Sequence, residues 1–577
     1  MAEVVVGIDF GSSGSGFAYA FSDNEDEIFQ GSINGANVDN KVPTSIILDD
    51  NNETIKFGVE CREYLKIKGR KAGHYFKDIK MNLYEKKNEI KANNTGKIFP
   101  LELVIQRVLE KLKDLAIVEI KKIRPNSQNN IKYVVTVPAI WEEFQKDIMM
   151  KACINAGLIK EEDDKSLFFA LEPEAASYYC LKNKSIDQNL MKEGDYYIIC
   201  DLGGGTGDIV THLIGANRNV NEICSPNGGK FGSNEINKLI FEEIIFKIFE
   251  CKDFNTFYTK YKEINDNFDD EEMLYEDWYE LERAIMDFKE GTNLPAVKDH
   301  EYYPINFSLF KDIFNDEVDI NTLVDKYNRD VTDDELKLKI RSKKKWIIDI
   351  PHQIIYKYIK NQVSSICEII NKILDFEKRI NSIIFVGGYC ANEVLTLEIK
   401  NNLSNKIKNF LQPSKPCLSI MEGAVLFGLN PNKIKTRKAK YTFGMCANDY
   451  WKEEIHAGKG DKYYDDDDNV WRCRDCFSKF ITINQDLDLG QEITRNYAFS
   501  KSRTCVMDFY KTFKPNPIFV NEEGIEKIGQ LRYEADKDYP IGERDNTVTM
   551  RIGGTFIDVK CKHTKSGKAI KTYLDFN

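Results

Sequence analysis

A glycine-rich loop at residues 200–208 carries residue types that could bind a phosphate. It has the sequence Cys-Asp-Leu-Gly-Gly-Gly-Thr-Gly-Asp and lies between two apolar runs, a pattern that predicts a β-hairpin. The three glycines at 203–205 leave the tip without Cβ atoms, so its N–H groups can approach a phosphate closely. Asp201 would add a carboxylate for magnesium, and the Thr206 hydroxyl could hold a phosphate oxygen or a water. The alternative interpretation is a plain tight turn.

The start of the chain repeats this design. Residues 4–8 form an apolar run, residues 9–16 read Asp-Phe-Gly-Ser-Ser-Gly-Ser-Gly, and residues 17–21 return as a second apolar run. Asp9 therefore stands at the end of a predicted strand and ahead of a glycine turn, as Asp201 does. Two such hairpins far apart in the sequence predict two similar lobes that face one nucleotide.

The two hairpins together resemble the phosphate loops of the actin, sugar-kinase and heat-shock-70 ATPase superfamily. Further segments are similar to the heat-shock-70 family in particular. The sequence near residues 136–141 and 440–444 is most similar to a divergent group of that family, heat shock 70 kDa protein 12. The resemblance covers residues 1 to about 435 and is weak beyond them. The segments that carry it are a lobe I strand at 131–139, Glu-Pro-Glu-Ala-Ala at 172–176, the adenosine motif Phe-Val-Gly-Gly-Tyr at 385–389 and a closing helix at 422–428.

This resemblance implies the fold and its division into parts. We expect an α/β chain with a two-lobed, actin-like ATPase fold of the ribonuclease-H-like type, followed by a smaller β-rich C-terminal domain. Apolar residues recur at helical spacing in 103–120 and 354–373, as such a fold requires. The expected parts are lobe I at 1–197, lobe II at 198–390 with an outer helical part at about 250–345, a closing segment at 391–435, and a reduced substrate-binding-like domain at 437–577.

The resemblance also implies roles for single residues. A lysine would neutralise the transferring phosphate, and we favour Lys80 over Lys77, although both could be solvated surface lysines. Glu172 would orient magnesium-bound water, or it could simply be an acid favoured by a helix dipole. Magnesium would be held through water by Asp9 and Asp201. The expected catalytic residues are Asp9, Lys80, Glu172, Asp201 and Thr206, and the expected nucleotide contacts are Gly11, Ser12, Ser13, Gly14, Gly203, Gly204, Gly205, Thr206, Gly232, Ser233, Glu282, Gly387, Gly388 and Tyr389.

One segment departs from the family pattern. The family clamps adenine with a helix that carries a glutamate followed by a lysine and an arginine. Here Glu282 is present, but the two basic positions appear as Ile285 and Met286. Each lost charged hydrogen bond would cost on the order of 1.5–3 kcal/mol, or roughly 10- to 150-fold in affinity. We therefore expect weak nucleotide binding or slow turnover.

The composition excludes several other classes of protein. Hydrophobic residues make up 42% of the 577 residues, which is enough for a buried core. The net charge of −11 disfavours non-specific binding to nucleic acid or to an anionic membrane. The fourteen cysteines are scattered, which predicts reduced thiols in a cytoplasmic protein rather than a disulfide framework. Neither a signal-peptide pattern nor an apolar run of about 18 residues occurs, so we expect no membrane span.

In the C-terminal region apolar and polar residues alternate as they do in β-strands, notably in 547–561, and a turn is predicted at 565–568. It is too short for a full peptide-binding sandwich plus helical lid of the heat-shock-70 type. Cys473 and Cys476 have metal-ligand spacing, but a structural zinc site needs four ligands and no second pair follows. Two free thiols are the favoured interpretation.

These observations predict an ATP-binding, heat-shock-70-like protein that uses ATP/ADP and magnesium. We expect a slow ATPase whose lobe closure controls a protein client through the C-terminal domain, with exchange factors or J-domain co-chaperones as further partners. The alternative is a nucleotide-gated binding or signalling module with negligible hydrolysis. A small-molecule kinase of the same superfamily is less favoured, because no general-base aspartate could be assigned.

Overall fold

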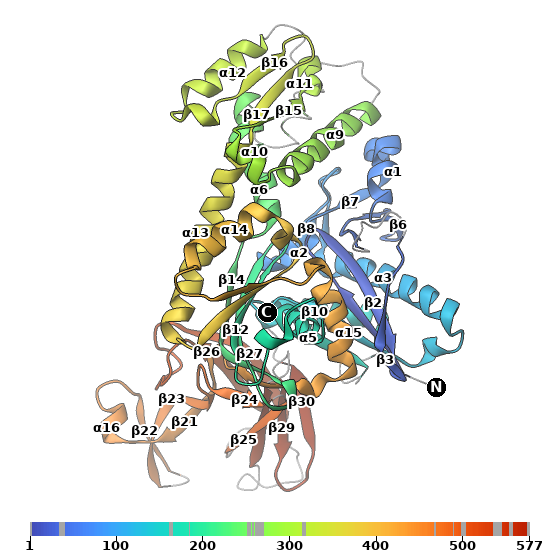
Figure 1. Cartoon of the computed structure of the whole chain (residues 1–577). Helices are drawn as coiled ribbons and strands as arrows, with labels where there is room; N and C mark the ends of the chain where they lie inside the picture. The colour runs from blue at the N-terminus through green and yellow to red at the C-terminus, as the bar shows by residue number, and fades with distance from the viewer. Residues whose placement is uncertain are drawn as a thin grey trace.

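The computed structural model is of mixed α/β type along the whole chain (Figure 1). The predicted α/β class is therefore confirmed, whereas the division into two lobes and a C-terminal domain stays a prediction. The structure describes residues 3–33, 41–160, 166–183, 185–250, 256, 259, 271–313, 319–466, 469–488, 490–497, 504–534, 545–552 and 558–573.

The first sheet contains the Asp9 hairpin. Its strand order is β11-β10-β1-β2-β3, with β1 antiparallel to β2 and parallel to β10. Alternate residues of β1 pack on opposite faces, Val4 and Val6 against helices α3 and α4, and Val5 against α5 and α15. Cover on both faces explains why the strand is apolar throughout. The bounds are β1 Val4–Asp9, β2 Gly14–Phe21, β3 Asn24–Gln30, β10 Ile131–Val137, β11 Leu167–Leu171, α3 Leu101–Ile123, α4 Glu143–Asn155, α5 Glu172–Lys182 and α15 Ser419–Leu429.

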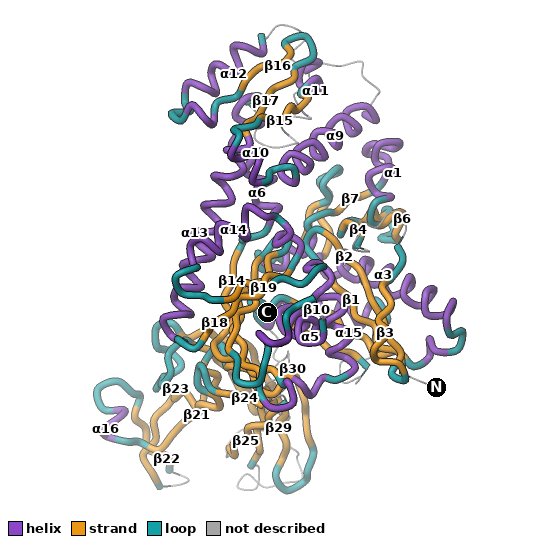
Figure 2. The backbone as a smooth tube through the Cα atoms, in the orientation of Figure 1, coloured by secondary structure: helices purple, strands orange, loops and turns teal. Residues whose placement is uncertain are grey.

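The second sheet contains the Asp201 hairpin and repeats this strand order. Its strands β14-β13-β12-β18-β19 match β3-β2-β1-β10-β11, with β12 antiparallel to β13 and parallel to β18. Helices α5 and α15 lie between the two sheets (Figure 2). The repeat places the two hairpins at equivalent positions. The bounds are β12 Tyr196–Leu202, β13 Gly207–Ile214, β14 Val220–Gly229, β18 Ile380–Val386, β19 Asn409–Leu411, α6 Ser233–Ile240, α13 His352–Phe376 and α14 Glu393–Leu403.

The outer part at about 250–345 is not purely helical, so that expectation is wrong in part. Its helices surround a three-stranded sheet of order β15-β17-β16, which forms the top of Figure 1. Short strands of five residues or fewer leave little alternation for a sequence pattern to show. The bounds are α9 Glu271–Glu290, α10 Leu294–Lys298, α11 Ser308–Ile313, α12 Ile320–Arg329, β15 Tyr302–Asn306, β16 Lys339–Ser342 and β17 Ile347–Pro351.

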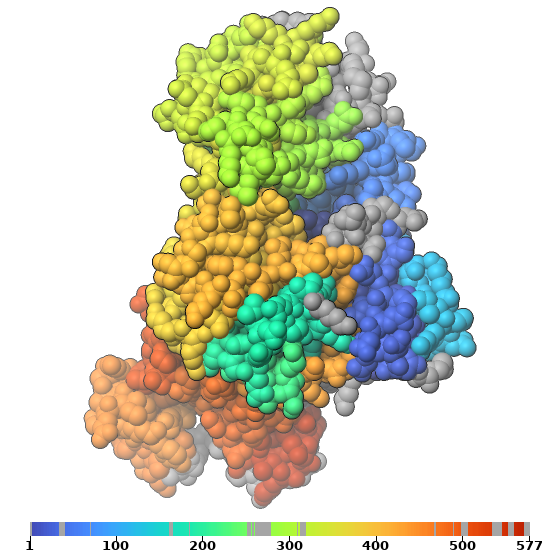
Figure 3. Space-filling view, viewed as in Figure 1, coloured from blue at the N-terminus to red at the C-terminus, as the bar shows by residue number. Residues whose placement is uncertain are grey.

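The C-terminal residues form two antiparallel sheets, β22-β23-β21-β26-β27 and β25-β28-β29-β30, around a shared core. Two strands from this part of the chain, β20 and β24, instead extend the second sheet beyond β14. At the bottom of Figure 3 these sheets end in two separate parts, one orange and one red. The bounds are β20 Ile434–Lys438, β21 Thr442–Tyr450, α16 Glu453–His456, β22 Lys462–Asp465, β23 Val470–Ile481, β24 Asp486–Asp488, β25 Gln491–Tyr497, β26 Thr504–Thr512, β27 Ile525–Glu534, β28 Asn546–Ile552, β29 Asp558–His563 and β30 Ala569–Tyr573.

The helices predicted at 103–120 and 354–373 are confirmed as α3 and α13. Among the described residues, no helix combines the length and the apolar character that crossing a membrane requires. Two small sheets, β6-β5-β7 and β8-β9, complete the N-terminal part. Their bounds, with those of the remaining short elements near the site, are β4 Val42–Pro43, β5 Ile46–Leu48, β6 Thr54–Phe57, β7 His74–Phe76, β8 Glu89–Lys91, β9 Ile98–Pro100, α1 Glu60–Lys68 and α2 Ile79–Tyr84.

Candidate functional site

A cleft of about 740 Å³ lies where the two glycine hairpins meet. This volume is in the range of pockets that hold a small ligand. Every residue predicted for catalysis or metal binding lines the cleft, and so does every predicted nucleotide contact except Gly232 and Glu282. The fold thus brings together residues from the start, the middle and the last third of the chain.

The tips of the hairpins touch one another, and glycine makes this approach possible. A Cβ atom on Gly204 would lie 1.8 Å from Oγ of Ser13, and one on Gly205 would lie 2.5 Å from Oγ of Ser12. A larger residue at either position would force the loops apart. The walls of the cleft here are therefore mostly backbone and hydroxyl groups, which are the groups that bind phosphate oxygens.

The turn around Gly232 supports the Asp201 loop from behind. The N–H groups of Ser233 and Asn234 donate to the carbonyl oxygens of Gly203 and Gly204 at 3.2 and 2.7 Å. A Cβ on Gly232 would lie 2.2 Å from the Gly204 carbonyl oxygen. Gly232 is thus a packing position, whereas Ser233 lines the cleft.

Three acids meet at the floor of the cleft, and each comes from the end of an element. Asp9 ends β1, Asp201 lies near the end of β12, and Glu172 begins α5; all three are buried. Burial raises the pKa of Asp201 well above its usual value, and the neighbouring charges of Glu172, Asp208 and Asp9 raise it further. Three acids buried this close together favour a bound cation.

Two lysines, the buried Lys80 and the partly buried Lys41, pair with these acids. Lys80 Nζ lies 2.5 Å from Oε1 of Glu172, and Lys41 Nζ lies 2.6 Å from Oδ2 of Asp9. Burial raises the pKa of Glu172, and the ammonium of Lys80 opposes this rise. Lys77 lies elsewhere, since its Nζ pairs with Glu282 at 2.6 Å. The structure therefore places Lys80 in the cleft and Lys77 outside it.

Glu282 and Lys77 line a second cavity of about 380 Å³ beside the cleft, with Ile285 and Met286. Ile285 is fully buried in the core of the second sheet, and Met286 reaches both cavities. One turn further along α9, Lys289 lines the cleft and supplies a cation that the sequence analysis did not anticipate. Burial lowers the pKa of Lys289 to about 8.

The loop after β18 closes the cleft with backbone. Gly387 has a φ of 85°, and a Cβ there would lie 2.4 Å from the Leu202 carbonyl oxygen and 2.5 Å from Oδ1 of Asp201. A Cβ atom added at Gly388 would meet nothing within 4 Å, and this residue lines the cleft. The Tyr389 hydroxyl donates to Oε1 of Gln362 at 2.8 Å and fixes the loop on α13.

Sequence reasoning assigned no role to Lys41, Asp208 or Lys289, which are among the charged residues that line the cleft. Asp208 ends the same glycine loop as Asp201 and pairs with it across the hairpin, so its position in the motif was a usable signal. Burial raises the pKa of Asp208 to about 7, with a further rise from Glu172. Lys41 and Lys289 lie in an ordinary turn and an ordinary helix, where no pattern distinguishes them from surface lysines.

Comparison with known proteins finds chains whose sequences are similar to this one. No protein-family model matches the chain. Heat shock 70 kDa protein 12B of Homo sapiens is 24% identical to it over 657 aligned residues, which cover 99% of this chain and 91% of that protein. Heat shock 70 kDa protein 12A of Mus musculus is 26% identical over 653 residues, and that of Homo sapiens is 25% identical, each with the same coverage. These similarities confirm the resemblance predicted from the sequence.

Proposed function

We propose that this chain is a heat-shock-70-like protein that binds ATP with magnesium in the cleft and hydrolyses it slowly. The observation that carries the proposal is the convergence of two glycine hairpins, three buried acids and two paired lysines around one cleft of about 740 Å³. Such a set provides N–H donors for phosphates, carboxylates for a hydrated cation and fixed positive charge.

The residues present fit a magnesium ion. Oδ1 of Asp201 is buried, and within the described part of the chain it has no hydrogen-bond partner. A buried carboxylate oxygen without a partner is costly unless a ligand satisfies it. Asp9 and Asp201 would hold the ion through its water ligands. Magnesium bound there would offset the charge of the phosphates.

Each of the chain's own groups has a definite task in this proposal. The N–H groups of residues 11–14 and 203–206 would hold the phosphates, and Lys80 would offset charge on the terminal one. Glu172, Asp201 and Thr206 would orient the attacking water. Phosphoryl transfer asks for positioning and electrostatic stabilisation more than for covalent chemistry, which matches a site built from fixed polar groups.

A chain of contacts leads from the cleft to the C-terminal sheets. The N–H of Ile140 donates to Oδ1 of Asp208 at 3.0 Å, and Nζ of Lys440 donates to the Ile140 carbonyl oxygen at 2.9 Å. Lys511, on β26, pairs with Glu142 at 2.6 Å. These contacts support the proposal that the nucleotide state acts on the C-terminal strands, and through them on a protein client.

Two alternatives lead to different expectations. A nucleotide-gated binding or signalling module with negligible hydrolysis is favoured by the apolar Ile285 and Met286, although Lys289 supplies a cation nearby. A small-molecule kinase needs a general-base aspartate beside a substrate pocket, a role that we assign to no described residue. A cytoplasmic location, and exchange factors or J-domain proteins as partners, belong to the proposal as well.

Gly388 offers a direct test of where the nucleotide binds. We expect ATP with magnesium to stabilise the unmodified chain by about 2.7 kcal/mol at 100 times its Kd. Gly388→Leu should abolish this effect, because a Cβ atom there meets open space and the larger side chain would extend into the cleft. Thermal unfolding with and without ATP measures the difference.

Gly388→Ala is the matched control, since its single methyl group should leave most of the ATP effect in place. Both variants should unfold at the same temperature as the unmodified chain when ATP is absent. Equal stabilisation of the leucine variant and the unmodified chain by ATP would move the nucleotide site away from this cleft.

A further inference from the structure

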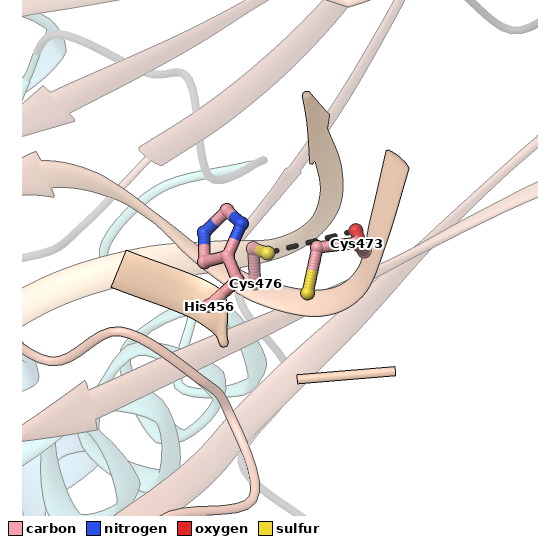
Figure 4. A group of neighbouring side chains, drawn as sticks. All are labelled: His456, Cys473 and Cys476. Atoms are coloured by element: carbon pink, nitrogen blue, oxygen red, sulfur yellow. Dashed lines mark hydrogen bonds between the residues drawn. The ribbon is translucent and has the colours of Figure 1, made fainter. Parts of the chain in front are cut away.

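Three metal-ligating side chains meet in the C-terminal region, far from the cleft in the fold. One donor atom each from His456, Cys473 and Cys476 lies within 4.8 Å of the other two, and all three residues are buried (Figure 4). The histidine precedes the cysteine pair in the sequence, at a position where no spacing pattern marks it as a ligand. We propose that His456, Cys473 and Cys476 bind a zinc ion.

The backbone of β23 is shaped to bring the two sulfur atoms together. Residues three apart on a regular strand point to opposite faces of the sheet. Here the pairing of β21 with β23 shifts register between Ala447 and Asp449, and Asp475 has a φ of 55°. This irregularity turns Cys473 and Cys476 toward the same side. Bulges that re-aim side chains in this way are typical of functional positions.

His456 is held in place by its own short helix, α16. The backbone N–H of Lys452 donates to Nδ1 of His456 at 3.1 Å, and the ring packs against Trp451 and Phe519 with centroids 5.6 and 5.9 Å apart. The hydrogen bond and the two ring contacts together fix the position of the imidazole beside the two sulfur atoms.

Neighbouring backbone segments cover the two sulfur atoms closely. A Cβ on Gly460 would lie 2.5 Å from Sγ of Cys473, so only glycine allows the loop after α16 to cover this sulfur. Cys476 forms an isolated β-bridge with Phe519, which closes the opposite side. The Cys476 thiol donates to the carbonyl oxygens of Cys473 and Arg474 at 3.6 and 3.7 Å, and these contacts fix the position of its sulfur.

The part of the molecule that carries the three residues has little apolar core of its own. Its cluster contains three buried residues, Cys473, Cys476 and Phe519, with Trp451 and Ile518 packed beside them. This part projects as the orange end at the lower left of Figure 3. A small projecting unit with so few apolar contacts generally needs a cross-link or a metal to hold its shape.

The ligand set selects the metal. Two thiolates and one imidazole favour zinc over magnesium or calcium, which prefer oxygen ligands. Three protein ligands leave the fourth position of a tetrahedral ion to water. Binding would convert the two thiols to thiolates and release two protons to the solvent. Deep burial disfavours a redox role, because reactive cysteines are generally accessible.

Metal analysis of the full-length chain tests the proposal. We expect about one zinc ion per chain after purification without chelators. Cys473→Ser, Cys476→Ser and His456→Gln should each lower the zinc content by more than about tenfold. The controls are Cys446→Ser, in the neighbouring strand β21, and Asp201→Asn, in the cleft. Both should keep the same zinc content as the unmodified chain.

Cobalt titration of the unmodified chain keeps the test independent of how the variants fold. Co²⁺ added to the zinc-stripped, reduced protein should give the visible absorption of a tetrahedral thiolate complex, and Zn²⁺ should abolish it. The proposal would be overturned by the absence of both zinc and this absorption. Undiminished zinc in all three variants, or a Cys473–Cys476 disulfide in the purified protein, would overturn it as well.

Discussion

Replacing Asp201 by asparagine is expected to slow ATP hydrolysis by about 10²- to 10³-fold, the usual cost of losing one preorganised electrostatic group. Asp201 lies at the point where β12 meets the glycine loop, and its Oδ1 is buried with no hydrogen-bond partner among the described residues. Asparagine keeps the shape of the side chain but removes the negative charge. Magnesium would then lose one of the two carboxylates that we assign to it.

Single-turnover hydrolysis with magnesium measures this effect, alongside direct nucleotide binding by both proteins. The matched control is Asp287→Asn, which makes the same chemical change at an exposed position on α9 and should leave the rate unaltered. Hydrolysis at the same rate in Asp201→Asn and the unmodified chain would exclude the assigned role. Binding without hydrolysis in either protein would favour the nucleotide-gated module.

Replacing Arg437 by methionine is expected to destabilise the chain by about 3–5 kcal/mol, the cost of breaking a buried ion pair from one side. Arg437, on β20, donates from Nε and Nη2 to the two carboxylate oxygens of Glu174, on α5, each at 2.6 Å. The two side chains are only 8% and 2% exposed. Without the guanidinium, Glu174 would remain buried close to Glu222, whose own pKa burial raises to about 8.

Urea unfolding of the two proteins measures the loss. Arg379→Met provides the control, because Arg379 forms a similar two-point contact with Glu377 while 64% of its side chain is exposed. That pair should contribute far less to stability, because solvent screens an exposed ion pair. If both variants lose a similar, small amount of unfolding free energy, the Arg437–Glu174 pair between β20 and α5 does not stabilise the fold as expected.

The features that the sequence predicted well are local ones. An acid, a run of glycines and two flanking apolar runs define each hairpin within about twenty residues, and the structure brings both hairpins to one cleft. The helices α3 and α13 followed from apolar spacing alone. Local patterns of this kind depend on backbone conformation and on which face of an element is buried, and both can be read without knowing the fold.

The features that could not be predicted depend on contacts between distant segments. Lys289 enters the cleft only because α9 packs on the second sheet, and its sequence context is that of an ordinary helix. His456 reaches the cysteines only because β23 is bulged and the loop at Gly460 folds over the sulfur. Strand β24 joins β20 across a long separation in sequence, which no alternation pattern could indicate.

The most direct test of ATP binding in the cleft is a calorimetric titration of the unmodified chain with ATP in the presence of magnesium. We expect saturable binding at a single site, weakened when magnesium is withheld, because Asp9 and Asp201 would then face the phosphates without a cation between them. A correctly folded chain that takes up no ATP under these conditions would contradict it.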